Sequence, residues 1–160
     1  LLITGEDTTN DTRRFNFTNT LNRLLELGAL PIINENDTVA TDEIVIGDND
    51  TLAAIVARSV HADMLILLSD IDGLYTADPH THPEATLLHH VAGIDDHIRE
   101  IAGISSSTQG TGGMVTKLHA ADICLGCGCK MVIANGNNPG NLYDILEGKA
   151  VGTTFSEERL

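Results

Sequence analysis

Residues 110–117 read Gly-Thr-Gly-Gly-Met-Val-Thr-Lys, so glycines run into a helix-like stretch that holds Lys117. Glycine lets backbone N–H groups approach an anion closely, and the free N–H groups at a helix start supply partial positive charge. A lysine in the first turn opposes the helix dipole by ~0.3–1 kcal/mol unless a phosphate lies between the two. The spacing is not that of a Walker P-loop. The segment therefore indicates a phosphate site, with a glycine-rich turn before a surface helix as the alternative.

Short polar clusters follow three apolar runs, at residues 34–37, 69–72 and 135–138, and a fourth cluster, 47–50, precedes a helical pattern. In open α/β sheets, ligands bind beyond the carboxyl ends of the strands. Each cluster alone is explained as an Asx-turn or a helix cap. Their occurrence together with the glycine segment favours a nucleotide site.

Apolar strands alternate with helical patterns along the chain, which predicts an α/β fold with a mostly parallel sheet. The continuous apolar run at 64–68 predicts a central strand covered on both faces. In the first helix Phe17, Leu21, Leu24 and Leu25 recur at helical spacing, and Gly28 supplies the C-terminal cap. We expect strands at 1–4, 30–33, 42–46, 64–68, 87–91, 130–134 and 151–155, and helices from 12 to Gly28, at 51–61, at 95–102, from the glycine segment to 125, and at 142–147.

The chain has 160 residues and a formal net charge of −14, with 9 Lys plus Arg against 23 Asp plus Glu. This size suits one domain, and the negative charge argues against nucleic acid or an anionic membrane as a partner. No apolar run reaches membrane-spanning length. The surplus of carboxylates suits a Mg²⁺-nucleotide enzyme.

The three cysteines, Cys124, Cys127 and Cys129, fall within six residues and superficially suggest a metal clip. A zinc site is disfavoured because no second cysteine pair or histidine stands at zinc-finger spacing. An odd number of cysteines without a secretory signal indicates reduced thiols in the cytoplasm.

Four motifs, taken in order, resemble the amino acid kinase family, and within it the members that act on L-glutamate. They are Asn-Glu-Asn-Asp at 34–37, Gly-Asp-Asn-Asp at 47–50, Ser-Asp at 69–70 with Gly-Leu-Tyr-Thr-Ala-Asp-Pro at 73–79, and the segment 110–117. The resemblance covers nearly the whole chain. It implies a three-layer α/β/α sandwich and a kinase (transferase) that uses ATP and Mg²⁺ to phosphorylate the side-chain carboxylate of L-glutamate. The product, γ-glutamyl 5-phosphate, is the first intermediate of proline biosynthesis.

The resemblance also implies residue roles. Asp37 and Asn49 are expected to bind glutamate, Lys117 to be catalytic, and Asp50 to orient catalytic lysines rather than act as a base. We expect Lys117 to be accessible to solvent. The residues expected to contact the nucleotide are Ser69, Asp70, Thr111, Gly112, Gly113, Met114, Val115, Thr116 and Lys117.

The resemblance further implies that residues 1–160 are the C-terminal, nucleotide-binding portion of an amino acid kinase domain, with part of the glutamate site at 34–50. The family's N-terminal lysine-bearing segment and the PUA domain of some members are not in this sequence, which begins without Met. We therefore expect a partial fold that is catalytically incomplete alone. Expected partners are a second copy of the chain and glutamate-5-semialdehyde dehydrogenase. The alternatives are a non-catalytic nucleotide-binding or assembly module, and a kinase for another carboxylate.

Overall fold

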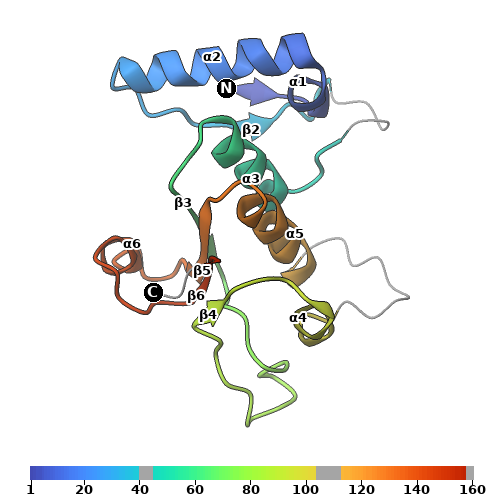
Figure 1. Cartoon of the computed structure of the whole chain (residues 1–160), viewed down its shortest axis with the longest axis vertical. Helices are drawn as coiled ribbons and strands as arrows, with labels where there is room; N and C mark the ends of the chain where they lie inside the picture. Colours follow the sequence, from blue (N-terminus) through green and yellow to red (C-terminus); the bar gives the residue numbers. More distant parts are fainter. Residues whose placement is uncertain (40–44, 104–112, 158–160) are drawn as a thin grey trace.

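Two sheets organise the chain, whose computed structural model describes residues 1–39, 45–103 and 113–157 (Figure 1). In the larger sheet the strand order is β3-β5-β6-β4. β3 and β5 are parallel, β4 and β6 are parallel, and β5 and β6 are antiparallel. The strands are β1 (Leu2–Ile3) and β2 (Asn34–Glu35), which form the smaller parallel sheet, and β3 (Met64–Ser69), β4 (His90–Val91), β5 (Lys130–Asn135) and β6 (Thr153–Phe155).

Helices cover both faces of the larger sheet. On one face, α3 (Asn49–Ser59) and α5 (Met114–Leu125) pack against Leu67, Met131 and Ile133. On the other face, Val132 and Ala134 contact α6 (Asn141–Leu146) through Ile145. Successive residues of a strand point to opposite faces, so β5 contributes to both cores. The predicted three-layer α/β/α arrangement is confirmed for this sheet, which is mixed rather than wholly parallel.

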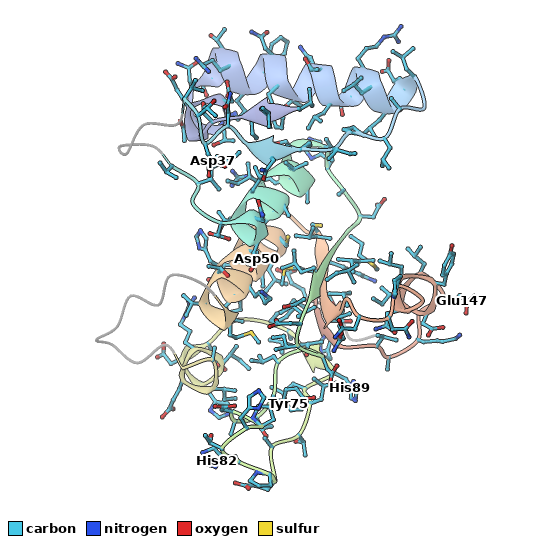
Figure 2. All side chains as sticks on the ribbon, turned by 180° about the vertical axis from the view of Figure 1, so that it is seen from behind. Asp37, Asp50, Tyr75, His82, His89 and Glu147 are labelled. Carbon is cyan, nitrogen blue, oxygen red and sulfur yellow. The ribbon has the colours of Figure 1, made fainter. Side chains whose placement is uncertain are left out.

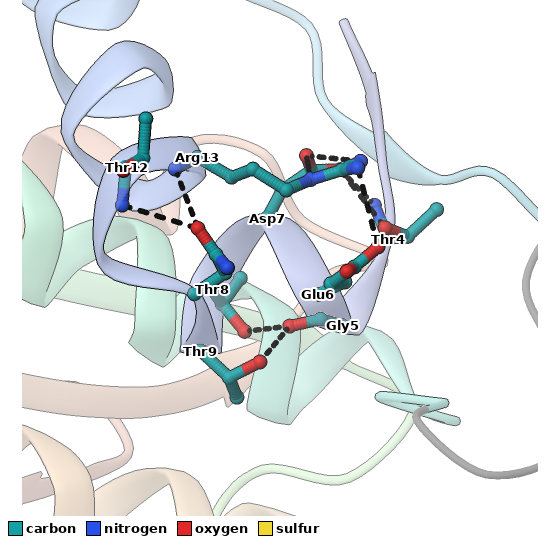
Figure 3. Close-up of polar contacts among 9 residues, drawn as sticks. Thr4, Gly5, Glu6, Asp7, Thr8, Thr9, Thr12 and Arg13 are labelled. Carbon is teal, nitrogen blue, oxygen red and sulfur yellow. Dashed lines mark hydrogen bonds and ion pairs between the residues drawn. The ribbon is translucent and has the colours of Figure 1, made fainter.

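The N-terminal helices α1 (Gly5–Thr9) and α2 (Asp11–Glu26) lie beside the smaller sheet. Asp7 ties them together: its carboxylate accepts hydrogen bonds from the Thr4 N–H at 2.7 Å and from Arg13 Nε at 2.8 Å (Figure 3). Burial by itself raises the pKa of the Asp7 carboxyl, but the hydrogen bonds from Thr4 and Arg13 outweigh burial and hold the pKa below its usual range.

The predicted first helix is confirmed, and Gly28 follows it with a φ of 69°. Phe17 and Leu21 are buried against Ile3, as their spacing predicts. Leu25, however, is 50 % exposed. The buried residues of α2 are Phe17 and Leu21, so the buried face of the helix ends before Leu25.

One predicted strand and the predicted position of another are wrong. The run 30–33 is not a buried strand: β2 begins at Asn34, and Leu30 and Ile32 are 87 % and 82 % exposed. Pro31 has no N–H for a ladder, and the carbonyls of Leu1 and Ile3 accept hydrogen bonds from the Asn34 and Asn36 N–H groups.

The apolar run at 64–68 does form a strand, but β3 is not central among the described residues. β3 pairs there with β5 alone, and Leu68 is 45 % exposed. β5 and β6 occupy the interior positions of this sheet instead. An apolar run shows that a strand is suited to burial, but it does not show which strands lie beside it.

The other predicted elements are confirmed with small shifts, including α4 (Asp96–Ile101) and the closing strand β6. The short strand expected at 42–46 falls mainly on residues 40–44, outside the described part of the chain. Within that described part, no helix combines the length and the apolar composition needed to cross a bilayer.

Candidate active site

The N-termini of α3 and α5 meet at the carboxylate of Asp50. The Asp50 Oδ2 atom accepts a hydrogen bond from Thr116 Oγ1 at 2.7 Å and one from Lys117 Nζ at 3.0 Å. Asp50 stands in the first turn of α3, just after Asp48 caps that helix by accepting from the Thr51 N–H at 2.7 Å. One oxygen of Asp50 therefore fixes two side chains of the glycine-segment helix.

Lys117 is buried, and the expectation that it is accessible to solvent is wrong. The residue is 9 % exposed, and its ammonium group forms an ion pair with Asp50. Sequence spacing could not show this burial, because it arises from the packing of α3 against α5. The Asp50 carboxylate offsets the unfavourable position of a lysine near a helix start.

Gly113 precedes α5 in a conformation that only glycine adopts readily. Its φ is 77° and its ψ is −139°, and no side chain caps the helix. The backbone therefore enters α5 without a side chain between the first N–H groups and the adjoining space, which is the arrangement that phosphate sites at helix starts use.

A cavity of about 460 Å³ lies beside this helix start. Three segments line it: the loop after β3, the end of α4 and the start of α5. Ser69, Asp70 and Lys117 supply polar groups, while Leu74 and Met114 supply apolar ones. The other lining residues are Ile71, Gly73, Tyr75, Ala77, Asp78, Pro79, His80, Ile101, Ala102, Gly103 and Gly113. The cavity thus combines an apolar wall with a polar edge that carries one buried ammonium group.

The loop after β3 is held on the sheet by hydrogen bonds from distant residues. Asn135 Nδ2 donates to Asp72 Oδ1 at 2.8 Å, and the hydroxyl of Thr153 accepts from the Leu74 N–H at 2.8 Å. The Tyr75 hydroxyl donates to Asp72 Oδ2 at 3.1 Å, and burial together with that carboxylate raises the pKa of Tyr75. The cavity wall formed by this loop is therefore fixed to β5 and β6.

The two ends of this loop are joined to each other at its base, and the exposed tip lies between them. Tyr75 forms an isolated β-bridge with Leu87, and the Thr76 N–H donates to the Thr86 carbonyl at 2.9 Å. Figure 2 shows Tyr75 near this base and His82 out at the tip.

The structure brings together most of the residues predicted to bind a nucleotide. Ser69, Asp70, Gly113, Met114 and Lys117 line the cavity, whereas Val115 and Thr116 do not appear in its lining. The Thr116 hydroxyl instead lies within hydrogen-bond distance of two acceptors, the Asp50 carboxylate at 2.7 Å and the Gly113 carbonyl at 2.9 Å. Thr111 and Gly112 lie outside the described residues.

The two residues predicted to bind glutamate, Asp37 and Asn49, do not line a common cavity in the described part of the chain. Asp37 is exposed beyond β2, and Asn49 lines a second cavity of about 410 Å³ together with Asn34 (Figure 2). Among the described residues, no hydrogen bond or ion pair links Asp37 to Asn49 or to Lys117. Their shared role stays a prediction.

Sequence reasoning missed part of the cavity wall. Asp78 belongs to the motif at 73–79 and His80 follows it directly; the motif marked this loop, but it did not show that these two side chains line the cavity. Ile101 is the last residue of α4 and Gly103 follows the C-cap Ala102, and their sequence holds no local indication of a ligand. They reach the cavity only because α4 packs near the start of α5.

The cysteines do not form a metal centre in the described part of the chain, where no three metal-binding side chains gather. Cys124 and Cys129 are buried, whereas Cys127 is exposed. Burial raises the pKa of Cys124 to about 12 and also raises that of Cys129. These two thiols therefore belong to the apolar core.

Comparison with known proteins gives a family match and close sequence relatives. The model of the "Amino acid kinase family" matches residues 1–135. Two proteins named glutamate 5-kinase, from Thermoanaerobacter sp. (strain X514) and Symbiobacterium thermophilum, are each 51 % identical to this chain, over 155 and 158 residues. These matches cover 97 % and 99 % of the chain, but 42 % and 60 % of the relatives. The chain therefore spans about half the length of the relatives that it matches.

Solved structures show the same fold at low sequence identity. An isopentenyl phosphate kinase aligns with a TM-score of 0.60 and 24 % identity, over 86 % of this chain and 50 % of its own. The UMP kinase from Bacillus anthracis aligns with a TM-score of 0.66 and 17 % identity, over 89 % and 52 %. At such identities the likeness concerns the fold alone.

Proposed function

The chain belongs to the amino acid kinase family, and we propose that it supplies the nucleotide-binding portion of an enzyme that phosphorylates the side-chain carboxylate of L-glutamate with ATP. The observation that carries this proposal is the buried Lys117–Asp50 pair beside the cavity, in a chain 51 % identical to proteins named glutamate 5-kinase. The product is γ-glutamyl 5-phosphate.

The chemistry requires charge neutralisation rather than a base. A glutamate side chain has an ordinary pKa of ~4.3, so the attacking carboxylate is already ionised at neutral pH. Its approach to a polyphosphate is opposed by repulsion, and positioned cations and N–H groups lower that barrier. Lys117 supplies a cation at the cavity, and Asp50 holds the Lys117 ammonium in place rather than removing a proton.

The nucleotide fits the cavity by its two kinds of lining. The base and ribose would lie along the wall that includes Leu74 and Met114, and the phosphates would lie toward the start of α5 and Lys117. Asp70 and Asp78 supply carboxylates in the same lining. Mg²⁺ in nucleotide enzymes takes one or two protein carboxylates with substrate phosphates, so these residues suit a Mg²⁺ ion that shields phosphate charge.

The glutamate site is proposed at residues 34–50, with Asp37 and Asn49 as contacts. A carboxylate such as that of Asp37 matches the α-ammonium of an amino acid, and the Asn49 amide can both donate and accept. Asn49 directly precedes Asp50 at the start of α3, so a substrate held by Asn49 would lie near the Lys117 pair. The amino acid kinase domain then carries part of its glutamate site and its nucleotide site in this one chain.

The wider setting follows from the product. An acyl phosphate is short-lived in water, so an enzyme such as glutamate-5-semialdehyde dehydrogenase must consume it, and we assign the reaction to the first step of proline biosynthesis. Free cysteines suit a cytoplasmic enzyme. We propose a homo-oligomer as the working form.

The test is L-glutamate-dependent ADP release with Mg²⁺-ATP, measured for the chain and for the complete product of its gene. We expect release by the complete product and none by the chain alone. Binding of Mg²⁺-ATP without release in either would instead favour a non-catalytic module. In the complete product, Asp37→Asn should sharply weaken glutamate binding, and unchanged glutamate affinity would favour a different carboxylate substrate.

A further inference from the structure

Glu35 is a buried carboxylate to which the proposed chemistry gives no part. The residue is 8 % exposed and lies in β2, where it pairs with Ile3 of β1. Its Oε1 atom accepts a hydrogen bond from the Ile46 N–H at 2.7 Å, and its Oε2 atom accepts one from the Gly47 N–H at 2.9 Å. Both oxygens are thus held by consecutive backbone amides, and among the described residues no cation pairs with Glu35.

These two hydrogen bonds join the smaller sheet to the start of α3. Gly47 has a φ of 82°, in the left-handed region, and the chain turns there into Asp48, the N-cap of α3. Asn49 and Asp50 follow in the first turn. A fixed Gly47 therefore sets where α3 begins and where the Asn49 and Asp50 side chains lie.

We propose that Glu35 is a positioning residue of the glutamate site. It holds β2, which leads to Asp37, at a fixed distance from the start of α3, which carries Asn49. Asp37 and Asn49 share no hydrogen bond among the described residues, so their separation depends on what links the two elements. This inference rests on the function proposed above.

The physical reason is that a small substrate held from two elements tolerates little relative movement between them. Displacement of a binding group by about 1 Å can lower the rate ~100-fold, although the displaced residue itself stays intact. Supporting hydrogen bonds of this kind lock the geometry of the residues that touch the substrate. Glu35 itself touches no reacting atom and is not a catalytic residue.

The test is Glu35→Gln in the complete gene product. Glutamine keeps the length and shape of the side chain, but it replaces one acceptor oxygen with an NH₂ group that faces a backbone N–H. We expect kcat/KM for L-glutamate to fall ~10- to 100-fold, while KM for Mg²⁺-ATP changes less than about threefold. Hydrogen exchange at the Ile46 and Gly47 amides should also become faster.

Glu26→Gln is the matched control, because Glu26 lies on the exposed surface of α2 and pairs only with Arg23 in the described structure. It should change neither kinetic constant. Glu35→Asp keeps the charge but shortens the side chain, and it should give an intermediate loss of kcat/KM. This second variant decides the matter if Glu35→Gln does not fold.

The outcomes separate this inference from the proposed function. If the wild-type protein shows no glutamate-dependent ADP release, the proposed function fails, and the role of Glu35 fails with it. If the wild type is active but Glu35→Gln retains its kcat/KM for glutamate and slow amide exchange, only this inference is overturned. An equal rise in KM for both substrates with a lower melting temperature would reduce Glu35 to a purely structural role, and would overturn it too.

Discussion

Lys117→Met separates the catalytic role of the buried ammonium group from its contribution to stability. Methionine keeps most of the apolar stem, so the variant loses mainly the hydrogen bond and the ion pair to Asp50. Hydrogen bonds to charged groups contribute ~1.5–3 kcal/mol. The Asp50 side chain is 22 % exposed and keeps its 2.7 Å bond from Thr116, so the remaining carboxylate is partly solvated and partly satisfied. We therefore expect the free energy of unfolding to fall by about 1–2 kcal/mol.

The expected loss of activity is larger. Removing one group that stabilises transition-state charge lowers kcat by ~10²–10³, equivalent to 2.7–4 kcal/mol. A protein with a stability of ~5 kcal/mol or more stays almost entirely folded after losing about 2 kcal/mol, so unfolding cannot account for a hundredfold loss.

The assay pairs urea unfolding with glutamate-dependent ADP release by the complete gene product. Lys149→Met is the matched control, since Lys149 pairs with Asp144 at 2.6 Å and with Glu147 on the exposed surface. Such exposed pairs contribute ~0–1 kcal/mol, and the control should keep full activity. A Lys117→Met protein that is folded and retains kcat within about threefold of wild type would refute the proposed role of the ammonium group.

Three further predictions concern other parts of the chain. Gly113→Ala should cost ~1–3 kcal/mol of unfolding free energy in urea, because φ is positive there, and should raise KM for ATP; an unchanged urea midpoint would contradict the strain. Iodoacetamide at pH 8 should label exposed Cys127 in the native protein before the buried Cys124 and Cys129, because burial raises the pKa of Cys124 to about 12. Peptide mass spectrometry reads the order of labelling, and early labelling of Cys124 would show that it is not buried. Asp7→Asn should destabilise the protein above pH ~4. The difference in stability between variant and wild type should shrink as pH falls through the lowered folded-state pKa of Asp7, because protonation then removes the same interactions from the wild type. A pH-independent difference in melting temperature would contradict the lowered pKa.

The sequence predicted best those features that depend on neighbouring residues. The helix that starts after Gly113 was found from a local glycine pattern. Ser69, Asp70 and Lys117 line one cavity, and their common role in binding a nucleotide stays a prediction. The continuous burial of β5 from Met131 to Ala134 likewise follows from an apolar run within a single strand.

Features that depend on the distance between elements could not be predicted. The burial of Lys117 and the sharing of one Asp50 oxygen arise from the packing of α3 against α5. Thr116 and Lys117 lie 66 and 67 positions after Asp50 in the chain. The apolar run at 30–33 was recognised in the sequence. It does not form a strand because β1 pairs with Asn34 and Glu35 instead, and the sequence does not show this register. The hydrogen bonds from the Ile46 and Gly47 N–H groups to Glu35 join residues 11 and 12 positions apart, and no residue type in the sequence indicates them.

The bridge between Tyr75 and Leu87 has a consequence for how this cavity could diverge among related proteins. Because the two ends of the loop are tied together at its base, residues added to or removed from the tip around His82 leave the ends in place. Closing a longer flexible loop costs only ~0.6 kcal/mol for each doubling of its length. Asp78, Pro79 and His80 lie on the same excursion and face the cavity. Insertions and substitutions in this loop can therefore reshape the cavity wall while the sheet beneath it stays the same. The loop is thus the part of the wall where sequence change disturbs the rest of the fold least, and where a change of ligand preference would require the fewest other changes.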